Sequence, residues 1–156
     1  MGTTTFKSER TSKTASFIIE ENIKTVFPLF GAFEERKWEK SWNPQLIYPQ
    51  TEVIEVGTTF FIEGKGEEKH MLWRVIQFDP LDHFIQYFVS TENRDWTILV
   101  RCEESDDGNS TKVAVTYTFI GLNAKGNQLN KEHIERMYQN ELQDWKQAID
   151  TYLNLK

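Results

Sequence analysis

Residues 44–122 carry the pattern that most restricts the fold of this chain, a run of strand-like segments separated by short turns. In the clearest segment, 111–122, apolar residues alternate with polar or small ones: Val113, Val115, Tyr117 and Phe119 against Lys112, Ala114, Thr116 and Thr118. Successive side chains of a strand point to opposite faces of a sheet, so this alternation predicts a sheet with one buried face. Turns rich in Gly, Pro, Asn and Asp separate the segments, which predicts antiparallel hairpins.

The expected strands are 12–20, 45–50, 58–64, 69–79, 83–92, 95–104 and 111–122. GKGEE at 64–68 is typical of a hairpin turn. Between the first and second strands, Asn22 is the expected N-cap of a short helix over 22–30, which Pro28 should bend or end. A second short helix is expected over 32–42, with Trp38 and Trp42 on one face and Pro44 at its end.

The C-terminal part of the chain changes to a helical period. From 128 to 153, apolar residues recur at steps of three or four, which predicts one long amphipathic helix. The stripe consists of Ile134, Tyr138, Leu142, Trp145, Ile149 and Tyr152. The order is strand, two short helices, a run of antiparallel strands and a long helix, which is typical of an α+β fold. We expect residues 1–10 to be a flexible tail and 11–156 to be a single domain.

This order, together with VFPLF at 26–30 and the tryptophans Trp38 and Trp42, resembles the START/polyketide-cyclase/pollen-allergen-like (SRPBCC) superfamily. LWRVIQFDPLDHFIQY at 72–87 is similar to the mid-sheet hairpin of that superfamily. The segment 26–42 resembles an uncharacterised bacterial branch. That branch usually has a cysteine and a proline where this chain has Gly31 and Ala32. The resemblance implies a helix-grip fold, in which a curved seven-stranded antiparallel sheet wraps around a long C-terminal helix and leaves an apolar cavity.

Composition and motifs narrow the functional classes. The net charge of −6 argues against a nucleic-acid partner, and no apolar run is long enough for stable membrane insertion. Cys102 is the single cysteine, which fits a cytoplasmic protein. His70, His83 and His133 lie in different expected elements, so we predict no metal site. We find no phosphate loop or nucleophile motif, and therefore no cofactor site and no catalytic residue.

The candidate ligand-binding residues are the aromatic side chains expected to face the inside of the sheet. Alternation alone leaves both faces open for strands 70–78, 84–89 and 96–102. Because they lie in the more apolar sets, Trp73, Tyr87 and Trp96 are expected to point inward. The full set is Trp38, Trp42, Trp73, Tyr87, Trp96, Tyr117, Phe119, Tyr138 and Trp145. Tyr and Trp combine an apolar body with a polar group, as small-molecule pockets require, although any single ring can equally fill the core.

Three functions are compatible with these features. The leading hypothesis is an intracellular protein that binds a small hydrophobic or amphipathic molecule, lipid-like or polyketide-like, between the sheet and the C-terminal helix. The first alternative is a polyketide cyclase, dehydratase or hydrolase that uses the same cavity. The second is a protein-interaction module like the chaperone-activator relatives of this fold. The small polar outer face of 111–122 argues against an apolar docking patch there. The oligomeric state, monomer or homodimer, stays open.

Overall fold

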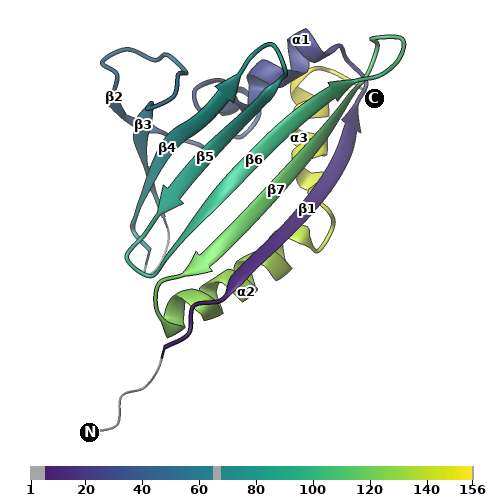
Figure 1. Ribbon diagram of the computed structural model, residues 1–156. Helices are drawn as coiled ribbons and strands as arrows, with labels where there is room; N and C mark the ends of the chain where they lie inside the picture. The colour runs from purple at the N-terminus through teal and green to yellow at the C-terminus, as the bar shows by residue number, and fades with distance from the viewer. Residues whose placement is uncertain (1–5, 65–67, 156) are drawn as a thin grey trace, which may run out of the picture.

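A computed structural model describes residues 6–64 and 68–155 of the protein. The strands are β1 (Arg10–Ile19), β2 (Gln45–Tyr48), β3 (Thr59–Glu63), β4 (His70–Asp79), β5 (Phe84–Ser90), β6 (Arg94–Glu104) and β7 (Thr111–Gly121). They form one antiparallel seven-stranded sheet in the order β1-β7-β6-β5-β4-β3-β2 (Figure 1). The helix-grip, α+β prediction is therefore confirmed. Residues 1–5 of the expected tail and 65–67 of the expected hairpin turn lie outside the described residues.

The chain between β1 and β2 forms three short helical segments, α1 (Ile23–Val26), η1 (Phe27–Phe30) and η2 (Glu34–Lys37). The predicted N-cap is confirmed, because Asn22 Oδ1 accepts a hydrogen bond from the Thr25 backbone N–H at 3.1 Å. The α-helix changes to a 3₁₀ helix at Phe27, next to Pro28, which has no N–H for an α-helical hydrogen bond. The second expected helix is reduced to the single 3₁₀ turn η2.

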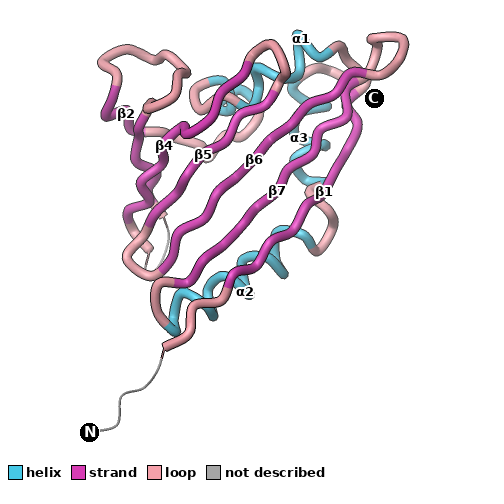
Figure 2. Tube along the Cα trace, in the orientation of Figure 1, coloured by secondary structure: helices cyan, strands magenta, loops and turns pink. Residues whose placement is uncertain are grey.

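The C-terminal segment is helical, but the structure divides the expected single helix into α2 (Ala124–Tyr138) and α3 (Gln143–Tyr152). It also begins earlier than expected, because Asn123 Oδ1 accepts a hydrogen bond from Gly126 N and caps the helix. Glu141 and Leu142 have φ angles of 54° and 60°, a left-handed conformation that cannot continue a right-handed helix. The apolar pattern of the sequence shows no sign of this break, because Leu142 is buried in the turn as it would be in a continuous helix. Figure 2 shows both helices along one face of the sheet.

Burial settles which side chains of the sheet point inward. Ile85, Tyr87 and Val89 of β5 are buried, and so are Trp96, Ile98, Val100 and Cys102 of β6 and the four expected residues of β7. In β4 the inward set begins with Met71, Trp73 and Val75. A bulge between Val75 and Gln77 then shifts the register, so that Phe78 joins the same face.

Residues 7–9, just before β1, form hydrogen bonds with the end of β7 and the start of α2. Ser8 Oγ donates a hydrogen bond to the Gly121 carbonyl at 2.6 Å. Asn127 Oδ1 accepts a hydrogen bond from Glu9 N, and Asn127 Nδ2 donates one to the Lys7 carbonyl. The strand then starts at Arg10, two positions before the expected residue 12. Only glycine fits at position 121 without a shift of Asn127, because a Cβ atom there would lie 2.0 Å from Asn127 Oδ1.

Candidate ligand-binding cavity

A cavity of about 310 Å³ lies between the sheet, the η1–η2 segment and the two C-terminal helices. All five tryptophans of the chain line it, together with residues from most of the elements around it. Its walls are Phe30, Glu35, Trp38, Glu39, Trp42, Ile62, Met71, Trp73, Tyr87, Trp96, Ile98, Val100, Tyr117, His133, Met137 and Trp145. Such a volume is in the range of small-molecule sites, at the lower end.

Two sets of aromatic rings form much of the cavity wall. Trp42 and Trp73 meet edge to face with ring centroids 5.1 Å apart, and Trp73 meets Tyr87 in the same way at 5.5 Å. On the helix side, Trp38 lies 5.7 Å from Trp145 and 5.9 Å from Phe30. Contacts at these distances favour fixed ring orientations, so the cavity has rigid walls.

Hydrogen bonds fix three of these rings to the backbone of residues 29–32. Trp38 Nε1 donates to the Leu29 carbonyl at 2.7 Å, and Trp42 Nε1 donates to the Ala32 carbonyl at 2.6 Å. The Tyr87 hydroxyl donates to the Phe30 carbonyl at 2.7 Å. In contrast, the Nε1 atoms of Trp73 and Trp96 are buried without a hydrogen-bond partner among the described residues. A buried donor without a partner is unfavourable by about 1–3 kcal/mol.

Glu35 brings a carboxyl group to the cavity wall. Removal from water, followed by repulsion from the charge of Glu39, raises its pKa from 4.5 to about 8. The group is therefore mostly protonated at neutral pH. Tyr87 and Tyr117 also have raised pKa values, because both hydroxyls are buried and the charge of Glu35 adds to the effect.

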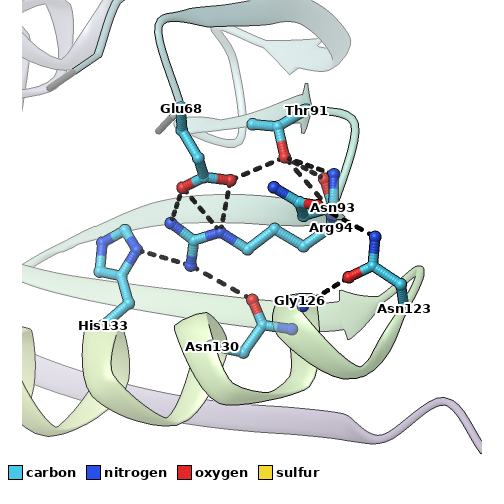
Figure 3. Close-up of polar contacts among 8 residues, drawn as sticks. All are labelled: Glu68, Thr91, Asn93, Arg94, Asn123, Gly126, Asn130 and His133. Carbon is cyan, nitrogen blue, oxygen red and sulfur yellow. Dashed lines mark hydrogen bonds and ion pairs between the residues drawn. The ribbon is translucent and has the colours of Figure 1, made fainter. Parts of the chain in front are cut away.

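His133 of α2 lines the cavity and contacts a buried ion pair behind it. Arg94 Nη2 lies 2.6 Å from Glu68 Oε1, and Arg94 Nε donates to both carboxylate oxygens of Glu68 (Figure 3). Arg94 Nη1 reaches Asn130 Oδ1 at 3.2 Å and His133 Nδ1 at 3.1 Å. Burial, with the charges of Arg94 and Arg136, lowers the pKa of His133 to about 4, so the imidazole is neutral at physiological pH.

Most of the aromatic residues singled out in the sequence meet at this cavity: Trp38, Trp42, Trp73, Tyr87, Trp96, Tyr117 and Trp145. The other two, Phe119 and Tyr138, do not line it. Phe119 is fully buried and stacks on Tyr117 with centroids 5.7 Å apart. The Tyr138 hydroxyl hydrogen-bonds the backbone of β7 at Val115 and Tyr117. Both rings belong to the packed core behind the wall.

The sequence reasoning missed the carboxyl and imidazole groups of the wall, which belong to Glu35, Glu39 and His133. A usable signal existed for Glu35 and His133. Glu35 precedes Trp38 by three residues, and His133 precedes Met137 by four, spacings that place side chains on one helical face.

Among the residues that the structure describes, no group of His, Cys, Asp and Glu side chains could hold a metal ion. Within residues 6–64 and 68–155, no helix is both long enough and apolar enough to cross a membrane.

Comparison with known proteins relates this architecture to solved structures. No protein-family model and no curated protein matches the sequence. Norcoclaurine synthase from Thalictrum flavum, solved with dopamine and hydroxybenzaldehyde, has a TM-score of 0.68 at 9% identity, over 94% of this chain and 87% of its own. Major latex-like protein 151 from Panax ginseng has a TM-score of 0.64 at 12% identity, over 92% and 97% of the two chains. A hypothetical protein from Helicobacter pylori has a TM-score of 0.69 at 15% identity, over 91% and 87%. The protein therefore has the START-like helix-grip fold that the resemblance implies.

Proposed function

We propose that the protein binds a small amphipathic molecule in the cavity between the sheet and α2–α3. The observation that carries this proposal is the convergence of all five tryptophans on one space of about 310 Å³. If these rings only filled the core, they would pack against one another and leave no such volume. The walls also contain Glu35, His133 and two indole N–H groups that have no partner in the described part of the chain, so a ligand with some polar atoms suits the cavity better than a pure hydrocarbon.

The cavity volume favours a compact ligand of one or two rings over a lipid with two long chains. The walls of rigid aromatic rings favour a flat, ring-containing molecule, because stacked and edge-to-face contacts need a planar partner. The complex of norcoclaurine synthase with dopamine and hydroxybenzaldehyde shows that this fold can hold small aromatic molecules. At 9% identity, its ligands are not transferred to this chain, and the ligand class is inferred from the residues of this cavity alone.

The experiment is a binding titration that uses the tryptophans as reporters. We expect 2-acetylnaphthalene to quench the intrinsic fluorescence in a saturable manner with one site per chain, and calorimetry to give the same stoichiometry. Ile98→Phe places a larger ring in the cavity and should abolish binding. Ile120→Phe, on the opposite, exposed face of the sheet, is the matched control and should bind normally. Absence of saturable binding, or equal binding by both variants, would refute the proposal.

A second function, acid–base catalysis in the same cavity, is favoured by one observation, the pKa of about 8 for Glu35. A carboxyl group with a pKa near the working pH is suited to remove and return a proton next to a carbonyl group. In D₂O, the Glu35 carboxylate would take a methyl proton of bound 2-acetylnaphthalene, and the electron pair of the broken C–H bond would stay on the ligand, which becomes an enolate. The protonated carboxyl group would exchange with D₂O and return a deuteron to the enolate carbon, which restores the ketone and the carboxylate. NMR should show methyl deuteration in the wild type and none in Glu35→Gln. Equal rates in the two proteins would exclude this role.

A further inference from the structure

His133 joins the cavity to a buried polar network around Arg94. Figure 3 shows its imidazole beside the Arg94 guanidinium, with Glu68 on the other side of Arg94 and Asn130 one turn earlier on α2. The side chains of Arg94 and Glu68 are only 6% and 10% exposed. The network therefore connects β6 and the segment before β4 to α2 at this end of the cavity.

The network fixes the proton of the imidazole. A guanidinium group can only donate hydrogen bonds, so His133 Nδ1, 3.1 Å from Arg94 Nη1, must accept one. A neutral imidazole that accepts at Nδ1 carries its hydrogen on Nε2. The charged groups around the ring are Arg94, Arg136 and Glu68. Burial and the two arginine charges lower the pKa of His133 and outweigh the opposite effect of Glu68, so the ring stays neutral. His133 is thus a neutral N–H donor in a defined tautomer.

Arg94 is held in place so firmly that the imidazole orientation is fixed too. Glu68 accepts hydrogen bonds from Arg94 at Nε and Nη2, and a further one from Thr91 Oγ1 at 2.7 Å. The His133 ring also packs against Phe119, Trp96 and Tyr117, with centroids 5.0, 5.8 and 6.0 Å away. A rotation of the imidazole would break the bond to Arg94 and disturb these ring contacts.

The donors at this end of the cavity have no acceptor within the described residues. Trp96 Nε1 is fully buried without a partner there. His133 Nε2 and the Tyr117 hydroxyl also form no hydrogen bond with a described residue, but these two atoms are less completely buried. All three residues line the cavity, and their rings are in mutual contact through His133. We propose that this end of the cavity is a subsite for a carbonyl oxygen of the ligand, with the His133 Nε2–H as its principal donor and Arg94 as the residue that positions it. This inference rests on the proposed binding function.

The electrostatics favour a neutral carbonyl group over a charged one. Glu68 balances the charge of the buried Arg94, the remaining donors are neutral, and Arg136 is exposed to solvent, so no unpaired buried cation is available to stabilise a carboxylate here. A cation would be repelled by the Nε2–H of His133 and by the charge of Arg94, whose Nη1 lies 3.1 Å from Nδ1 of the same ring. A neutral oxygen acceptor satisfies the donors without introducing a charge into an apolar space.

The test compares two ligands that differ only at the oxygen, 2-acetylnaphthalene and 2-isopropenylnaphthalene, in which CH₂ replaces the carbonyl oxygen. We expect the wild type to prefer the ketone by about 3- to 10-fold, the range for one net hydrogen bond. His133→Phe should lose this preference and still bind the alkene. His133→Gln, which keeps an acceptor for Arg94 and an N–H donor, should restore part of it. The infrared carbonyl band of the bound ketone should lie at lower frequency in the wild type than in His133→Phe.

Several results would overturn the inference. A ketone preference that is unchanged in His133→Phe, with both ligands bound, would reject the subsite while leaving the binding function intact. Failure of the wild type to bind either ligand would reject the binding function and the subsite together. If His133→Phe does not fold, the tautomer of His133 in the wild-type protein tests the subsite instead. Nitrogen-15 NMR of wild-type His133 should show hydrogen on Nε2 from pH 6 to 8, and hydrogen on Nδ1 would refute the assignment.

Discussion

Replacement of Glu35 by Gln should make the folded protein more stable at pH 8, and the gain should depend on pH in a defined way. The pKa of Glu35 is about 8 in the folded protein and 4.5 as its ordinary value. Below pH 4.5 the carboxyl group is protonated in both the folded and unfolded states, so it does not affect the difference between them. As the pH rises to 8, the unfolded state ionises first, and the folded state loses stability relative to it.

The magnitude follows from the two pKa values. A tenfold difference in proton affinity corresponds to about 1.4 kcal/mol, so a pKa change from 4.5 to about 8 sets an upper limit of about 5 kcal/mol. Glu35 is only half-buried, and residual contact with water reduces the effect. We therefore expect Glu35→Gln to raise the free energy of unfolding by about 2–4 kcal/mol at pH 8 relative to the wild type, with no effect of this kind below pH 4.5.

Urea unfolding of both proteins at intervals from pH 4.5 to 9 would measure this difference directly. Subtraction of the wild-type curve from that of Glu35→Gln removes the contributions of all other titrating groups that the substitution leaves unchanged. The neighbours that could respond are Glu39, Tyr87 and Tyr117, and the raised pKa values of the tyrosines keep both neutral over this range. Glu55→Gln, at an exposed position, is the control and should follow the wild type at every pH. A difference curve without slope between pH 5 and 8 would refute the reasoning.

Three further predictions concern the walls and the core. Trp38→Ala should lower the free energy of unfolding by about 3–5 kcal/mol in urea titrations, because the ring is buried and its Nε1–H bonds the Leu29 carbonyl; a loss below 1 kcal/mol would mean that the ring is only a lid. Burial raises the pKa of the Cys102 thiol to about 12, so a thiol reagent at pH 8 should react only after denaturation, and rapid native labelling would contradict the structure. Arg94→Met should cost about 3–5 kcal/mol by leaving Glu68 as a buried charge without its partner; the double variant with Glu68→Leu should recover much of this, and no recovery would argue against the pair.

The sequence determined the sheet and its inner face where the period was regular. Val113 to Phe119 alternate without interruption, and the burial of β7 follows that alternation residue by residue. The tryptophans were also found from the sequence, because several large rings among charged residues need an apolar surface to cover. Their meeting around a common cavity was expected from the resemblance to the helix-grip fold. What no local pattern could give is how much of that space stays empty.

The features that the sequence did not reveal depend on contacts between distant segments. A bulge turns Phe78 inward, and a left-handed turn at Leu142 ends α2 and precedes α3. Both residues are apolar, so the sequence reads the same with or without the bulge and with or without the turn. Phe119 follows the alternation of β7 and Tyr138 the helical period of α2, but both rings lie one layer behind the cavity.

Glu35 and His133 show most clearly what only the tertiary structure decided. In the sequence, each is an ordinary polar residue of a short helix or an amphipathic one. The pKa of Glu35 rises because the surrounding rings remove its carboxyl group from water. His133 becomes a fixed neutral donor because Arg94, which is 39 positions away, occupies its Nδ1. Local patterns in a sequence fix which faces are apolar, whereas protonation and hydrogen bonding depend on the groups that folding brings together.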